Sequence, residues 1–132
     1  MILGGINLKR EAKLTLRQKN GTYKDYIIDF VSESQRLEYI RLEAELEERV
    51  DEKGTPIKPT DLDYSAVQTK FVANLFGVKE KEILDGLDSL DRNQVYEIIR
   101  YRVLGFNKEE DERLKKALME ANLDGVTSTT SN

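Results

Sequence analysis

Hydrophobic and polar residues alternate along the chain from Ala12 to Phe30, around a central Asn20-Gly21 pair. Alternation with a period of two is typical of β-strands with one buried face, and Asn-Gly is a strong hairpin signal. A two-residue loop would put the apolar residues of the two strands on different faces, whereas a three-residue loop or a bulge at Gly21 shifts the register by one. We therefore expect a bulged hairpin with one shared apolar face, made of Ala12, Leu14, Leu16, Tyr26, Ile28 and Phe30.

A helix is predicted from Glu33 to Val50, because Ser32 and Gln35 form a capping-box pattern and the segment lacks Gly and Pro. At 100° per residue its apolar positions fall into two stripes on nearly opposite sides. One stripe holds Leu37, Ile40 and Ala44, and the other holds Tyr39, Leu42, Leu46 and Val50. A surface helix normally has one such stripe. Two interpretations stay open: the helix is sandwiched between the hairpin and later helices, or one stripe contacts another subunit.

Both prolines of the chain, Pro56 and Pro59, lie together with Gly54 in one short segment. This composition is typical of a linker. We expect a single domain overall, in which residues 1–50 form the hairpin and first helix, 51–60 a Pro/Gly linker, 61–124 a helical bundle and 125–132 a disordered tail.

Four helices are predicted in the bundle from caps and glycines. The first runs from Asp61 to Phe76 and is the most apolar, so we expect it to be central. The fold class is therefore mainly α, a small helical domain with an N-terminal β-hairpin (α+β). The other three are a short helix from Lys79 to Asp85 with Gly86 as a left-handed C-cap, one opened by Asp91 and Gln94 that closes at Gly105, and one from Asn107 to about Ala121.

The amino-acid composition excludes most familiar kinds of catalytic site. The chain has no Cys, His or Trp, so thiol nucleophiles, imidazole bases and the commonest zinc ligands are missing. The formal charge of -4 argues against nucleic acid or an anionic membrane as a partner, although the hairpin is locally basic. No segment is apolar enough for a signal sequence or a membrane span. We expect a non-enzymatic cytoplasmic protein that binds protein.

Clustered aspartates are the only candidate metal ligands. Asp61 and Asp63 begin like a calcium loop, but Ala66 and Val72 stand where that loop needs Gly and Glu. A second set, Asp85, Asp88 and Asp91, is explained equally by helix ends. We expect these residues to cap helices, with no cofactor and no metal, and a carboxylate-based hydrolase would instead need a Glu with a raised pKa in a cleft.

Four segments together resemble a known protein family: Tyr26-Ile-Ile-Asp-Phe30, Phe71-Val-Ala-Asn-Leu-Phe-Gly77, Glu82-Ile-Leu-Asp-Gly-Leu87 and Ile98 to Gly105. They are similar to the tail assembly chaperones of long-tailed (siphovirus) phages of Gram-positive bacteria. The resemblance covers roughly residues 12 to 105 and consists of hydrophobic spacing and turn residues.

This resemblance implies a chaperone without catalytic residues. Such a protein coats the tape measure protein, recruits tail tube (major tail) subunits, self-associates as a homo-oligomeric ring or spiral, and stays in the host cell cytoplasm, outside the mature virion. Many members also have a longer frameshifted form. The two-stripe helix supplies the candidate self-association or client contacts, Tyr39, Leu42, Leu46 and Val50. The alternative is a generic adaptor or regulatory domain that binds one globular protein.

Overall fold

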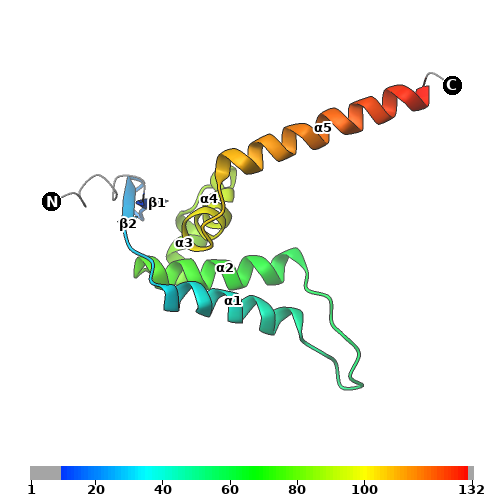
Figure 1. Cartoon of the computed structure of the whole chain (residues 1–132). Helices are drawn as coiled ribbons and strands as arrows, with labels where there is room; N and C mark the ends of the chain where they lie inside the picture. Colours follow the sequence, from blue (N-terminus) through cyan, green and yellow to red (C-terminus); the bar gives the residue numbers. More distant parts are fainter. Residues whose placement is uncertain (1–9, 131–132) are drawn as a thin grey trace.

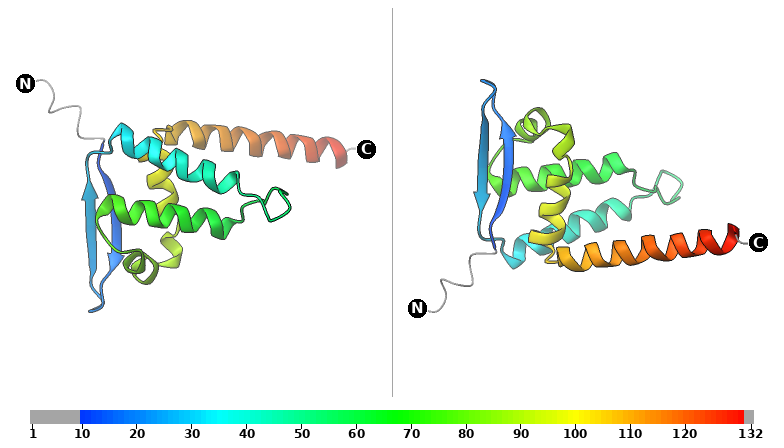
Figure 2. Two further views of the ribbon diagram at one scale, coloured as in Figure 1. Left: turned by 90° about the horizontal axis from the view of Figure 1, so that it is seen from below. Right: turned by 90° about the horizontal axis from the view of Figure 1, so that it is seen from above.

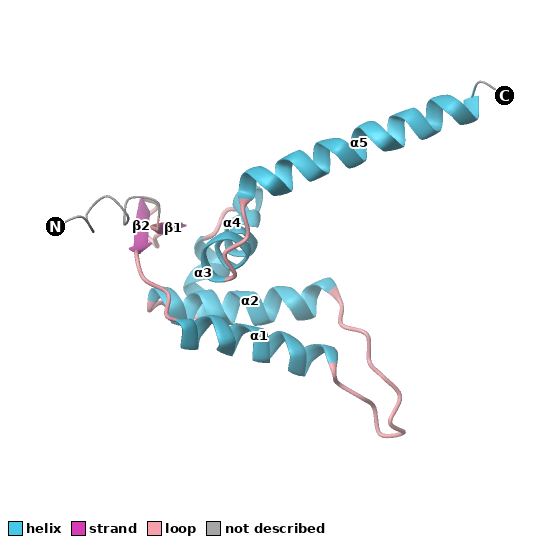
Figure 3. Cartoon of the chain, in the orientation of Figure 1, coloured by secondary structure: helices cyan, strands magenta, loops and turns pink. Residues whose placement is uncertain are grey.

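The structure is a computed structural model that describes residues 10–130, with only the backbone described from 124 onward. Residues 1–9 and 131–132, including the start that the sequence predicts to lack a signal segment, lie outside the described residues. Two strands are followed by helices (Figures 1 and 3). They are β1 (Ala12–Arg17), β2 (Tyr23–Ile28), α1 (Glu33–Glu47), α2 (Asp61–Phe76), α3 (Glu80–Gly86), the 3-10 turn η3 (Ser89–Asp91), α4 (Asn93–Glu97), the π-helical segment η4 (Ile98–Val103) and α5 (Lys108–Thr130). The predicted fold class is confirmed.

The hairpin has the predicted bulged register. Leu14 lies opposite Tyr26, and Ala12 lies opposite Ile28. Gln18 and Thr22 close a three-residue loop, with 2.7 Å between the Gln18 amide nitrogen and the Thr22 carbonyl oxygen. Gly21 takes the left-handed conformation that this loop requires, with φ 85°. Phe30 departs from the prediction, because it lies beyond β2 and its side chain is 74% exposed.

The hairpin stands at one end of the molecule, and helices cover one of its faces (Figure 2). Helix α2 is central, as predicted, since it contacts α1, α3, α4, β2 and η4. Arg102 of η4 ties the two ends of the hairpin together, because its guanidinium donates to the carbonyl oxygens of Arg10 and Asp29. These contacts hold η4 and the hairpin together.

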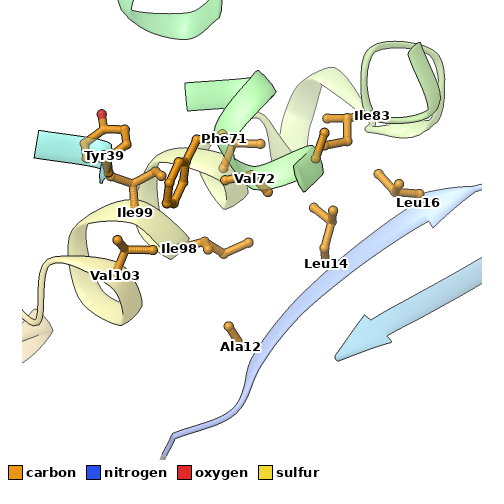
Figure 4. Close-up of a cluster of buried hydrophobic side chains, with 12 residues drawn as sticks. Ala12, Leu14, Leu16, Tyr39, Phe71, Val72, Ile83, Ile98, Ile99 and Val103 are labelled. Carbon is orange, nitrogen blue, oxygen red and sulfur yellow. The ribbon is translucent and has the colours of Figure 1, made fainter. Parts of the chain in front are cut away.

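One hydrophobic core joins the hairpin to the helices (Figure 4). Leu14 and Leu16 point from β1 toward α2 and α3, and Ile99 of η4 lies beside Tyr39 and Phe71. The remaining buried members are Ala12, Val72, Ala73, Ile83, Val95, Ile98 and Val103. The aliphatic residues from Val95 to Val103 lie in the helix predicted before Gly105 and are buried, although the backbone there changes from an α-helix to a π-helix.

Helix α1 begins with the predicted capping box and ends three residues earlier than predicted. It stops because the chain turns back on itself: the Ile57 amide donates to the Arg49 carbonyl at 2.9 Å, and Val50 forms a β-bridge with Pro56. Asp51 closes the turn by accepting the backbone amides of Lys53 and Thr55. The segment that the sequence predicts as a linker is therefore an internally hydrogen-bonded turn.

Gly86 is not the left-handed C-cap that the sequence predicts, since positive φ occurs among the described glycines at 21, 54, 77 and 105. Its role is close packing: a Cβ atom on Gly86 would lie 2.7 Å from the Arg17 carbonyl oxygen of β1. The sequence pattern shows only that Gly lies at a helix end. The hairpin that needs this space is far away along the chain.

Asp91 and Gln94 do not form the predicted capping pair. Asp88 caps η3 through the Leu90 amide, and the Gln94 side chain accepts the Thr15 amide of β1 at 2.9 Å. Gln94 thereby satisfies a backbone donor on the β1 edge that faces away from β2.

Helix α5 begins at the predicted cap, where Asn107 accepts the Glu110 amide. It then continues to Thr130, whereas the sequence predicts a disordered tail from residue 125. Residues 122–130 contain no proline, the residue that most strongly disrupts a helix.

Candidate interaction surfaces

Two of the four predicted contact residues lie in the core. The Tyr39 side chain is 1% exposed, and its ring meets the Phe71 ring edge-on with 5.2 Å between centroids. Leu46 is 9% exposed on the same side of α1. This side of α1 packs against α2, so these two residues are covered within the chain itself.

The Tyr39 hydroxyl is buried and makes no hydrogen bond of standard geometry among the described residues, although the polar side chains of Glu43 and Gln68 lie beside it. It points away from the other labelled core side chains (Figure 4). Burial, together with the nearby Glu43 carboxylate, raises the pKa of this phenol well above its usual range. Tyr39 therefore stays neutral at all physiological pH values and contributes to the core as an aromatic ring.

The other two predicted contact residues reach the surface. Leu42 is half-buried and lines a hollow of about 270 Å³ between α1 and α2, together with Leu75 and parts of Phe71. Val50 is exposed beyond the end of α1. Leu42 thus combines core packing with an accessible edge, and Val50 belongs to the turn.

The second stripe of α1 is the exposed one. Leu37 and Ile40 are 51% and 43% exposed, and Ala44 lies next to them along the helix. The helix around them is charged: Arg36 pairs with Glu33, and Arg41 pairs with Glu38 and Glu45. Sequence reasoning found both stripes but favoured the other one for contacts. The larger apolar area of the Tyr39 stripe is the signal that would have assigned it to the core.

Helix α5 carries further exposed apolar residues, namely Leu114, Leu118 and Met119. The ion pairs between α5 and the body that involve described residues lie in its first turn, where the Arg100 guanidinium makes two hydrogen bonds of 2.5 and 2.9 Å to the Asp111 carboxylate. The same guanidinium lies over the Phe106 ring. Arg100 lowers the pKa of Asp111, so this ion pair is fully formed at neutral pH. From there α5 diverges from α1 and α2 (Figure 1).

A wide hollow of about 1010 Å³ lies between the hairpin loop and α3. Its lining includes the basic residues Arg17, Lys19, Lys79 and Lys81 beside the acidic Glu82 and Asp85. Lys24 lies close by and stacks on the Tyr26 ring. Two basic residues of the hairpin, Arg17 and Lys19, thus line this hollow.

Of the aspartates considered as metal ligands, Asp63 and Asp88 have structural partners. Asp63 completes the capping box of α2 with Thr60 and pairs with Arg49. Within the described part of the chain, no three carboxylates come close enough to share a metal ion. The Glu and Asp residues with a resolved shift, Glu33, Glu38, Asp63 and Asp111, all have lowered pKa values because cations or backbone amides face them. None of these four resembles the raised general acid of a glycosidase.

None of the described helices has both the length and the apolar character needed to cross a membrane. In the comparisons with known proteins, the family model described as phage tail chaperone protein matches residues 7–122. No curated protein and no solved structure gives a match. The family match spans the hairpin, the core and most of α5. The chain therefore belongs to the phage tail chaperone family.

Proposed function

We propose that this chain coats the tape measure protein of a long-tailed phage as a self-associating oligomer, and that it recruits tail tube subunits to that client during tail assembly. It acts without catalysis, in the host cytoplasm, and is absent from the finished virion. A siphovirus of Gram-positive bacteria is the proposed source. The family membership carries this proposal.

The surface of the molecule supports a chaperone of this kind. A holdase needs accessible apolar side chains that cover the apolar segments of a client. Such side chains lie on several elements here: Leu37 and Ile40 on α1, Leu42 at the hollow beside α2, and Leu114 and Leu118 on α5. Charged residues lie between them along both helices.

The four predicted contact residues fall into an accessible pair and a buried pair. Leu42 and Val50 remain proposed contacts in the conformation described. Tyr39 and Leu46 would serve a partner only by opening the α1–α2 interface, and we propose that they act instead by holding α1 in place.

Co-expression with the tape measure protein tests this function. We expect the tape measure protein to be insoluble alone and to co-purify with several copies of the chaperone per client chain, as measured by size-exclusion chromatography with light scattering. Purified tube protein should then displace the chaperone from the complex. An unrelated α-helical protein of similar size is the control for solubilisation.

A complex of fixed 1:1 stoichiometry with a folded globular protein, and no effect on tape measure solubility, would contradict this proposal. That result would favour the adaptor class, in which one domain binds one globular partner.

A further inference from the structure

Strand β2 has an open edge on the outer side of the hairpin (Figure 2). Thr15 lies opposite Asp25, and its amide donates to the Gln94 side chain rather than to β2. Backbone groups of an antiparallel strand point alternately toward its neighbour and away from it. Tyr23, Asp25 and Ile27 therefore direct their amide and carbonyl groups away from β1.

No described residue pairs with this edge. The backbone hydrogen bonds that residues 10–130 form outside the hairpin ladder do not involve Tyr23, Asp25 or Ile27. Proline and a bulge, two devices that block a strand edge, are also absent from β2, whose pairing with β1 is continuous from Tyr23 to Ile28. An edge of this kind can accept an extended chain as a further strand.

The two faces of β2 offer different chemistry to such a strand. On the outer face, the Tyr23 and Ile27 side chains are 60% and 57% exposed. On the inner face, which Lys24 shares with the buried Leu16, the Lys24 ammonium lies 4.8 Å from the centre of the Tyr26 ring. Side chains on the same face of neighbouring strands contact each other. A strand beside β2 is therefore stabilised by apolar residues on its outer face and by carboxylates on its inner face.

The hollow between the hairpin loop and α3 adds to the preference for carboxylates, because Tyr26 lines it too. Its cations are Arg17, Lys19, Lys79 and Lys81, and within residues 10–123 neither these four nor Lys24 form an ion pair. Two carboxylates, Glu82 and Asp85, also line the hollow, and Glu82 already accepts the Lys79 amide at 3.4 Å. The lining thus keeps a positive charge, although the whole chain has a formal charge of -4.

We propose that the β2 edge binds an extended segment of a partner protein, in which acidic residues facing the hollow alternate with apolar residues facing Tyr23 and Ile27. Main-chain hydrogen bonds to Asp25 and Ile27 hold the segment, and the alternation of its side chains selects it. A nucleic acid does not fit, since it has no peptide groups to extend the ladder and the chain is negatively charged overall. This inference goes beyond the proposed function, because it requires neither self-association nor the tape measure protein.

Amide hydrogen exchange with a designed peptide tests the pairing residue by residue. The probe is a short peptide of alternating glutamate and valine with blocked ends, added to the isotope-labelled full chain and followed by NMR. At saturation we expect the Asp25 and Ile27 amides to exchange at least about tenfold more slowly than in the free protein. The Lys24 and Tyr26 amides point toward β1 and should change little, so they are internal controls.

Three matched peptides separate backbone pairing from simple charge attraction. One has the same composition with its glutamates and valines in two blocks, one alternates lysine with valine, and one is the alternating acidic peptide with every second amide N-methylated. The alternating acidic peptide should bind about tenfold or more tightly than each of the three.

Variants of the chain test the same edge from the other side. Ile27→Pro removes an outward-pointing amide and should abolish peptide binding in a folded protein, whereas Tyr26→Pro removes a hydrogen bond to β1 and should destabilise the hairpin. Lys24→Glu should weaken binding of the acidic peptide about fivefold or more. Circular dichroism checks the fold, and the N-methylated peptide carries the test if Ile27→Pro unfolds.

Three outcomes would overturn the inference. The first is equal binding of the block peptide with no slowing of exchange at Asp25 and Ile27, and the second is tighter binding of a single-stranded DNA oligonucleotide than of the acidic peptide. The third is protection of the Asp25 and Ile27 amides in the free protein that rises with its concentration, which would show that a second copy covers the edge. Solubilisation of the tape measure protein is measured without the peptide, so the proposed function stands or fails separately.

Discussion

At the scale of single residues, close packing and burial decide which side chains matter. Gly86 is required because α3 approaches the β1 backbone so closely that a Cβ atom would meet the Arg17 carbonyl oxygen at 2.7 Å. Tyr39 fills the space between α1 and Phe71 while its hydroxyl makes no hydrogen bond of standard geometry among the described residues. Both features depend on neighbours that are distant along the chain.

Gly86→Ala should destabilise the protein by about 1–3 kcal/mol, because β1 or α3 must shift to make room for the methyl group. Alanine in a helix otherwise stabilises by about 0.5–1 kcal/mol relative to glycine, so the sign of the effect is informative. Urea denaturation measures the change. Gly77→Ala is the comparison: its Cβ meets open space, but φ is 69°, so a cost of about 1 kcal/mol should appear without any change in the amide resonance of Arg17. A stabilised Gly86→Ala variant would refute this role.

Tyr39→Phe should leave the protein as stable as before or raise the free energy of unfolding by about 1 kcal/mol, because it removes a buried hydroxyl that makes no hydrogen bond of standard geometry among the described residues. The wild type should also lose stability above about pH 10. There the unfolded chain releases the Tyr39 proton while the folded chain, whose Tyr39 pKa is raised by burial, retains it.

Thermal unfolding of wild type and Tyr39→Phe between pH 7 and 11 checks both points. Tyr23→Phe is the control, since Tyr23 is 60% exposed and its replacement should not change the melting temperature at pH 7. A large loss of stability in Tyr39→Phe at pH 7 would show that the hydroxyl has a stabilising partner after all.

At the scale of elements, α1 has two apolar stripes, and the structure shows which one is buried. The stripe with the larger apolar area packs against α2, and the smaller one faces outward. A charged substitution should therefore strongly destabilise the protein on the inner stripe and hardly change its stability on the outer stripe.

Leu46→Asp places a carboxylate at a position that is 9% exposed and should cost about 3 kcal/mol or more, enough to unfold much of the protein. Ile40→Asp, on the outer stripe, should change stability by about 0.5 kcal/mol or less. Circular dichroism and thermal unfolding distinguish them. If Leu46→Asp remains a folded monomer, the Tyr39 stripe faces a partner rather than the core.

At the scale of the whole molecule, the body and α5 are separable. The core cluster is drawn from the hairpin, α1, α2, α3, α4 and η4, and none of the described side chains of α5, residues 108–123, belongs to it. Helix α5 projects from the body (Figure 1), and we propose that it serves contacts with partners.

A chain that ends at Asn107 should fold with a free energy of unfolding within about 1 kcal/mol of the full chain, because it loses only the two ion pairs at the start of α5. It should also self-associate less. A chain that ends at Glu97 is the control and should not fold, since it lacks Ile98, Ile99 and Val103 of the core. Cooperative unfolding and light scattering report the two properties. A collapse of stability in the Asn107 chain would show that α5 is part of the folded core.

The sequence alone predicted most elements of this protein, because the signals for them are local. The capping box at Ser32, the bounds of the helix from Asp61 to Phe76 and the register of the hairpin depend on residues a few positions apart. Where those local signals competed with distant contacts, the prediction failed: Gln94 bonds to β1 instead of capping a helix, and Gly86 makes room for β1 instead of ending one.

For the candidate surfaces, the pattern along α1 located both apolar stripes but could not assign them, because a helical period says which residues share a face and not what covers it. The family resemblance came from hydrophobic spacing that the core preserves. Only the tertiary structure decided that the Tyr39 stripe is inside, that the Leu37 stripe is outside and that α5 projects. Each of these depends on how helices pack against one another, and packing joins residues that the chain keeps far apart.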